Sequence, residues 1–227
     1  MKILYVILFL SAIPLFGQGT YQLRGRIAGV RPNEKLFLKK QDNTSSRILT
    51  IDTIRCQSNG FVFRHTLPEV DIYTVMIDGV AGQVSFLFDH DMVLTGSRDT
   101  FKAARITGSP LTDEWRRFER EVSTPFEEKL MSLFAQRRAA GRDTITTALI
   151  NSEIRQLRAD KTQAVNQRIR QRPGSLLSLY LLNWYWNDMP KTDALELFAG
   201  LSTPVKSHSV AGKLRQQLGL MQDGRQN

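Results

Sequence analysis

The sequence predicts an α+β protein in which an N-terminal antiparallel β domain is followed by a helical region with a long helical hairpin. Between Thr20 and Thr107, short segments alternate apolar and polar residues and are separated by turn residues, a pattern typical of antiparallel strands. After Gly108 the apolar residues recur every three or four positions, the spacing of amphipathic helices. We therefore expect four parts: a signal peptide over 1–19, a β domain over 20–108, a helical region over 109–222 and a disordered tail over 223–227.

The β domain is predicted to be sandwich-like or a curled sheet, because its strands follow one another at short, regular spacing. In its first strand, Tyr21, Leu23 and Ile27 share one face. Asn59-Gly60 is expected to form a hairpin turn. Seven segments are predicted as strands: 20–29, 34–40, 45–56, 61–67, 71–78, 82–89 and 91–97.

The helical region begins with a recognisable start signal. Ser109 is suited to cap the first free amides and Pro110 suits the first helical position. Pro125 lies inside the first apolar stripe and predicts a kink or break near residues 123–124. The second arm of the hairpin is expected over about 144–171, and two further helices are expected at 193–201 and near 208–220.

The segment LLSLYLLNWYWNDM, residues 176–189, is apolar on most sides and is expected to form the buried helix. It contains the aromatic residues Tyr180, Trp184, Tyr185 and Trp186. Aromatic side chains of this kind serve either to pack a helix end or to line a groove. Core packing is the commoner use, and these four residues are the candidate groove or partner-binding residues if a groove faces the β domain.

The N-terminus has the order of residues found in secretory signal peptides. Lys2 precedes an apolar run from Ile3 to Leu10, and small residues follow at Gly17 and Gly19. The run is shorter than the roughly 18 to 20 residues that span a bilayer, so cleavage is favoured over a membrane anchor. With no cysteine near this site to carry a lipid, the sequence predicts a secreted or periplasmic protein.

The formal net charge of +9 indicates a basic surface. Lysine and arginine are spread along the chain without the dense run typical of nucleic-acid binding, so no nucleic-acid partner is expected. A general attraction to an anionic membrane surface, polysaccharide or acidic partner is the expected consequence. The charge pattern gives no information on oligomeric state.

No catalytic site or cofactor site is predicted. Cys56 is the single cysteine and is interpreted as a small buried hydrophobic residue, with a reactive thiol as the alternative. The histidines His65, His90 and His208 are scattered, and no nucleophile motif accompanies them. The segment FDHDM, residues 88–92, could suggest a metal site, but its polar residues are more typical of a tight turn.

Three motifs carry a family resemblance: DTIRCQSNGFVF at 52–63, ITGSPLTDEW at 106–115 and RPGSLLSLYLL at 172–182. In this order they resemble an N-terminal domain of unknown function, family 4369, found in Bacteroidetes envelope proteins. That family usually forms the amino-terminal part of periplasmic thioredoxin-like oxidoreductases, whose redox domain follows the last helices. This chain departs from it at His65, where the family often has glycine, and the chain ends where the redox domain would begin.

The resemblance implies a fold and an envelope location, and it provides no catalytic residues. The expected function is therefore a non-enzymatic envelope binding module whose partner is a protein, a peptide or a glycan. The alternative is an accessory subunit, or a degenerate relative, of a thiol-disulfide oxidoreductase that acts with a separately encoded redox chain.

Overall fold

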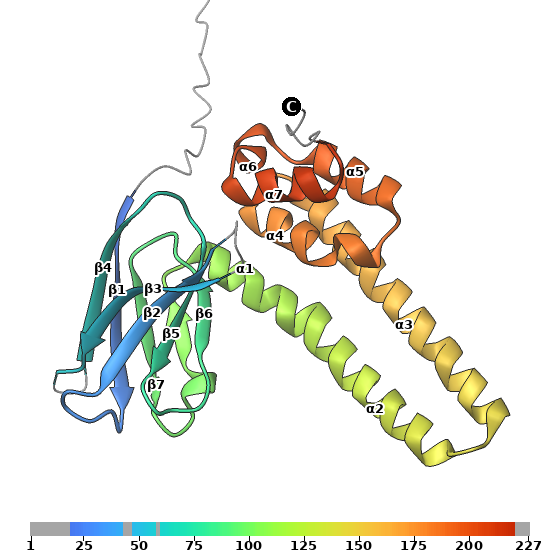
Figure 1. Cartoon of the computed structure of the whole chain (residues 1–227), viewed down its shortest axis with the longest axis horizontal. Coiled ribbons are helices and arrows are strands. Elements are labelled where there is room, and N and C mark those ends of the chain that lie inside the picture. Colours follow the sequence, from blue (N-terminus) through green and yellow to red (C-terminus); the bar gives the residue numbers. More distant parts are fainter. Residues whose placement is uncertain (1–18, 43–46, 58–59, 221–227) are drawn as a thin grey trace, which may run out of the picture.

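The computed structural model describes residues 19–42, 47–57 and 60–220 of the chain (Figure 1). The predicted signal peptide, except for Gly19, and the predicted tail over 223–227 lie outside these residues. The described chain forms a β domain followed by a helical region, which confirms the predicted fold class.

The described part of the β domain contains eight strands in two four-stranded sheets. One sheet, sheet A, has the order β4-β1-β7-β8, and the other, sheet B, has the order β3-β2-β5-β6. The strands are β1 (Gly19–Ala28), β2 (Lys35–Gln41), β3 (Ile48–Arg55), β4 (Gly60–Leu67), β5 (Ile72–Ile77), β6 (Val84–Leu87), β7 (Met92–Ser97) and β8 (Arg105–Thr107). All seven predicted strands are present, and β8 is an addition that the sequence analysis did not predict.

Every pair of neighbouring strands is antiparallel except β1 and β7, which are parallel. The predicted antiparallel domain therefore contains one parallel pair. The physical reason is that sheet B and β4 lie between β1 and β7 in the chain, so the connection is long enough to return in the same direction.

The two sheets share one apolar core. Alternation along the strands places Leu23 and Ile27 of β1 and Leu36 and Leu38 of β2 inside, all with no exposed surface. Cys56 belongs to this core and is 1% exposed, which confirms its interpretation as a buried residue.

Gly60 belongs to strand β4 and not to the turn between β3 and β4, in which it was predicted to lie. Gln57 and Gly60 exchange two backbone hydrogen bonds, at 3.1 and 2.9 Å, and Gly60 is the first residue of β4. Asn59, the other half of the predicted turn, lies outside the described residues. Phe61 and Phe63 return to the core, as predicted.

The helical region begins at the predicted boundary. Ser109 accepts a hydrogen bond from the Thr112 amide, and Pro110 is the first residue of α1. Asp143 and Ser175 cap α3 and α4 in the same way. The helices are α1 (Pro110–Phe118), the π-helix η2 (Glu119–Ser123), α2 (Thr124–Ala140), α3 (Thr144–Gln171), α4 (Leu176–Tyr185), α5 (Lys191–Gly200), α6 (Thr203–Lys206) and α7 (Ser209–Gln217), with short 3-10 turns η1 (Phe101–Ala103) and η3 (Trp186–Asp188).

Pro125 produces a wider helical turn. The segment η2 lies directly before it and joins α1 to α2 without leaving the helix. A proline cannot donate to the carbonyl four residues earlier, and a π turn is one way to accommodate the missing bond. The predicted disturbance near 123–124 is therefore present as a π turn.

The helices differ in how much of their surface is covered. In α4 every residue from Leu176 to Leu182 is buried, so it is the central helix, as predicted. By contrast, α2 and α3 form an antiparallel arm that points away from the β domain (Figure 1). Of the apolar residues in the arm's outer half, Leu133, Ile150 and Ile154 are buried, in a small cluster of their own.

The β domain and the helices are joined at the start of α1, which contacts β6 and β8. The backbone of Leu87 in β6 bonds the Ser109 and Thr112 hydroxyl groups at 3.0 to 3.2 Å. Val70 and Leu87 also belong to the apolar core of the helical region. This junction fixes the outer face of sheet B against α1, α4 and α7.

Candidate functional site

A groove of about 520 Å³ lies between the outer face of sheet B and the helices α1, α4 and α7. Its floor includes Ile72, Thr74 and Met76, the alternate residues of β5 that point away from the sandwich core. The Thr74 and Ser85 hydroxyl groups are hydrogen-bonded across the floor at 3.0 Å. We call this space the interdomain groove.

One wall of the interdomain groove is aromatic. The ring of Trp184 lies 5.6 Å from that of Trp115 and 5.7 Å from that of Tyr180, measured between centroids. These distances are those of interacting aromatic pairs. Trp184 is 39% exposed, whereas Tyr180 is buried. The wall therefore offers a ligand one accessible indole ring that is held in place by two less accessible ones.

Polar groups surround this aromatic wall. Lys39 and Lys40 reach the groove from β2, and Lys213 reaches it from α7. The side-chain oxygen of Asn183 is buried and has no hydrogen-bond partner among the described residues. The groove thus combines an apolar surface, positive charge and a hydrogen-bond acceptor, which is the usual composition of a binding site.

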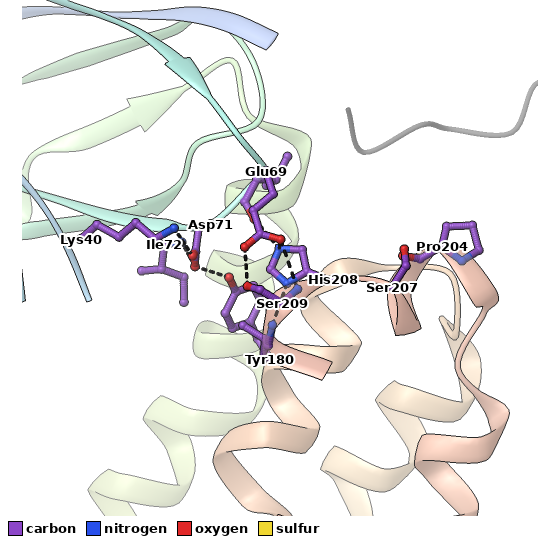
Figure 2. Close-up of polar contacts among 11 residues, drawn as sticks. Lys40, Glu69, Asp71, Ile72, Tyr180, Pro204, Ser207, His208 and Ser209 are labelled. Carbon is purple, nitrogen blue, oxygen red and sulfur yellow. Dashed lines mark hydrogen bonds and ion pairs between the residues drawn. The ribbon is translucent and has the colours of Figure 1, made fainter. Parts of the chain in front are cut away.

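Asp71 ties the two parts of the chain together at the inner end of the groove (Figure 2). Its carboxylate is 2% exposed, and it pairs with the Lys40 ammonium group at 2.7 Å. The same carboxylate accepts hydrogen bonds from the Tyr180 hydroxyl and from the Ile72 amide. A buried carboxylate is tolerated only with such compensation, so these partners fix α4 against sheet B.

The tyrosines near Asp71 are held in their neutral form. Burial raises the pKa of Tyr180 well above its usual value, and the adjacent negative charge of Asp71 raises it further. Burial, together with the charges of Asp71 and Glu69, raises the pKa of Tyr73 to about 12. Both phenols are therefore poor bases at neutral pH, and the cluster acts as a structural tie.

A second tie joins α7 to the loop between β4 and β5 (Figure 2). The His208 Nδ1 atom accepts from the Val210 amide at 3.2 Å, so its Nε2 atom is the one that donates, to the Val70 carbonyl oxygen at 2.7 Å. Glu69 accepts hydrogen bonds from both the amide and the hydroxyl of Ser209.

This group of residues does not have the arrangement of a hydrolase triad. In a triad the histidine accepts the proton of the serine hydroxyl. Here the Ser209 hydroxyl donates to Glu69, and both nitrogens of His208 are engaged by backbone groups. The Ser209 hydroxyl is therefore held by a carboxylate and not by the histidine.

The four predicted groove residues do not all lie in the same place in the structure. Tyr180 and Trp184 lie in the interdomain groove. Tyr185 instead lines a second, wider cleft of about 1230 Å³ between the arm and the segment from the end of α4 to the start of α5. The Lys161 ammonium group lies 4.9 Å from the centroid of the Tyr185 ring. Trp186 packs against the helical core.

The sequence analysis missed several residues of the interdomain groove and its ties. Trp115 was not among the candidate groove residues, yet its ring lies 5.6 Å from that of Trp184 in a tilted arrangement. Asp71 and His208 gave no local signal, because their partners are distant in the chain. An aspartate directly before an apolar strand and a histidine at a helix start are the only hints that the sequence contains.

The two carboxylates of the segment FDHDM have different partners. Asp89 accepts from the Leu111 amide at 3.3 Å, near the start of α1, whereas Asp91 accepts from the Gln22 amide at 2.8 Å. One carboxylate thus bonds α1 and the other bonds β1. Across the described residues, no group of three or more histidine, cysteine, aspartate or glutamate residues could hold a metal ion.

The fold and the groove define a two-part protein, a mixed β-sandwich joined through a buried polar junction to a helical region with a projecting arm. Residues 21–115, which comprise most of the β domain and the start of α1, match the family model of a domain of unknown function, DUF4369. The resemblance seen in RPGSLLSLYLL lies outside the matched residues.

Two further findings concern relatives of the chain and its helices. A search of the curated proteins finds no match to the chain. Among the residues that the structure describes, no helix combines the length and the apolar character needed to cross a bilayer.

Proposed function

We propose that the chain is an exported, non-enzymatic binding module of the cell envelope and that the interdomain groove receives its partner. The observation that carries this proposal is Trp184, a large aromatic residue that is 39% exposed and lines a groove between the β domain and the helices. An indole held in this way provides much contact area at a low cost in conformational entropy.

The contacts that hold the groove residues in place support a binding role. Asp71 fixes its inner end, and the Trp115 and Tyr180 rings hold Trp184 from two sides. A preformed groove does not have to be ordered when a partner binds, so more of the contact energy appears as affinity. The basic groups at its rim favour a partner with negative charge.

The chemistry of the candidate nucleophiles also supports binding rather than catalysis. The Cys56 thiol is buried and donates to the Gly60 carbonyl oxygen at 3.3 Å. Thiol exchange requires an accessible thiolate, which this position does not offer. The N-terminal apolar run supports export, and the family resemblance supports an envelope location with a protein, a peptide or a glycan as partner.

Site-specific photocrosslinking tests this function. The residue at 184 is replaced by a photoreactive benzoylphenylalanine, and the full chain is irradiated with envelope material from its source. We expect one dominant adduct. Val93, 45% exposed on β7 of the opposite sheet, is the matched control position and should give no such adduct. Equal labelling from both positions, or none from either, would contradict the proposal.

A disulfide-reductase assay separates this proposal from an enzymatic role. The wild-type chain and the Cys56→Ser variant are assayed with the same reductant and substrate. We expect both to show only the background rate. Turnover by the wild type that is lost in the variant would overturn the binding-module interpretation.

A further inference from the structure

One half of β3 is an open sheet edge. β3 is the outermost strand of sheet B, and among the described residues only β2 forms a ladder with it. Its second half lies near β4, where the His65 imidazole bonds the Asp52 carboxylate at 3.0 Å. Its first half, residues 48–51, has no such neighbour in the part of the chain that the structure describes, and all four residues are exposed.

The backbone of this half presents unused hydrogen-bonding groups. The Asp42 amide bonds the Arg47 carbonyl at 2.8 Å, which sets the alternation of the antiparallel ladder. Every second residue then turns its N–H and C=O away from β2, and in this half these residues are Ile48 and Thr50. Donors and acceptors at this spacing are complemented by another extended polypeptide, and sugars and lipids do not supply such a ladder.

The side chains of the open half are apolar on both faces. Ile48 is 72% exposed, Leu49 is 44% exposed and Ile51 is 37% exposed. Natural edge strands are usually protected by charges or proline, and residues 48–51 contain neither. A bulge does occur at Ile51, because Leu38 pairs with Asp52 and Lys39 pairs with Thr50. The bulge limits any added ladder to a short segment.

The open edge is continuous with the interdomain groove. Ile48 lines the groove, and Lys39, which lies opposite Thr50 in the ladder, lines it as well. A strand added beside β3 would therefore have one end at the groove that contains Trp184. The lysines at this end favour an acidic residue in the added segment.

We propose that the partner binds as a short, extended peptide segment that adds to β3 at Ile48–Ile51 and places one end in the interdomain groove. This inference rests on the proposed function and specifies the chemistry of the partner. The segment has apolar residues at alternate positions and an acidic residue near the groove. A second copy of the chain fits less well. Its own β3 is already part of a sheet, so pairing the two β3 strands would place no free peptide end in the groove. A four-residue ladder is also much smaller than a stable dimer interface requires.

Binding of a synthetic peptide tests the inference. The probe is the end-blocked peptide acetyl-Glu-Val-Thr-Val-Thr-Phe-amide. The control is the same peptide with N-methyl groups on alternate residues. Binding to the full chain is measured by calorimetry, and amide exchange is followed residue by residue. We expect the unmodified peptide to slow exchange of the Thr50 amide, and N-methylation to weaken binding by about tenfold or more because it removes the donors of the ladder.

Three variants locate the binding site. Ile48→Lys should weaken binding by about tenfold, because it puts a charge on the open edge. Val62→Lys is the matched control, since Val62 is also apolar, 50% exposed and in an edge strand, β4. It should leave the affinity within about twofold. Circular dichroism checks that all variants are folded.

Trp184→Ala distinguishes this inference from the proposed function. If this variant abolishes binding while Ile48→Lys and N-methylation do not, the groove binds peptides but strand addition is wrong. Absence of binding by the unmodified peptide also overturns strand addition, while photocrosslinking from position 184 judges the groove independently. If the wild type forms a dimer that Ile48→Lys converts to a monomer, the edge pairs with a second copy and the inference is likewise overturned.

Discussion

The junction between the β domain and the helices is held together differently from the α2–α3 arm. The junction combines the apolar core around α4 with buried polar ties centred on Asp71 and His208. The outer half of the arm has a cluster of only three buried residues among those described, and the other buried residues of α3 lie at its inner end, in the helical core. The comparison indicates that the interdomain groove belongs to the most stable part of the molecule and the arm to a part that can open separately.

The largest effect is expected at the junction. Asp71→Ala leaves the Lys40 ammonium group and the Tyr180 hydroxyl without their buried partner, and it should lower the free energy of unfolding by about 3 to 5 kcal/mol. Denaturant unfolding followed by circular dichroism measures this loss. Glu196→Ala, which breaks the exposed pair with Arg170, is the control and should change stability by less than about 1 kcal/mol. Equal losses of unfolding free energy in both variants would contradict the prediction that the buried ties stabilise the junction more than exposed ion pairs do.

A smaller and local effect is expected in the arm. Leu133→Ala creates a cavity between α2 and α3 at a fully buried position, and the cost should be about 3 kcal/mol. Because few other contacts hold the outer arm, most of this cost should appear as faster amide exchange near Leu133, Ile150 and Ile154. Amide exchange in β1 and α4 should change little. Uniform acceleration across the chain would show that the arm and the junction unfold as one unit.

The sequence predicted the elements that depend on local pattern. The bounds of α3 follow from its cap at Asp143 and its periodicity, and the strands follow from side-chain alternation. The parallel pairing of β1 with β7 was missed, because periodicity identifies a strand but does not identify its neighbours. The three-residue strand β8 is too short to show any alternation.

The candidate site was predicted in part. Tyr180 and Trp184 are four residues apart and share a helix face, so they meet in the groove. Tyr185 is rotated by about 100° from Trp184 at the end of the same helix and therefore points to the second cleft. The tie between Asp71 and Tyr180 joins residues 109 positions apart and has no local signal.

Alkaline pH should weaken the β domain and its junction with the helices before the arm. The pKa of Tyr73 is raised to about 12 and that of Tyr180 is raised well above its usual value, mainly by burial. Both tyrosines keep their protons in the folded chain while the unfolded chain loses them above about pH 10. Their contribution is fully present below pH 10 and is lost as pH rises through the folded-state values. The denaturant concentration at the unfolding midpoint should decrease as pH is raised from about 10 to 12. The Tyr73→Phe variant should show a smaller decrease.

Acidic pH should have the smallest effect, and within the helical region it should act at the end of the arm. The pKa of Asp143 is lowered because the carboxylate accepts hydrogen bonds from the Thr146 hydroxyl and amide and from the Ile145 amide. A lowered pKa means that the cap stabilises α3 above the unfolded-state value of about 3.8 and is lost as pH falls through the folded-state value. Amide exchange at low pH should accelerate first at the start of α3. The Asp143→Asn variant, which caps without ionising, should show no such pH dependence. Acceleration that appears equally around Ser175, the uncharged cap of α4, would show that the arm is not the part that responds to acid.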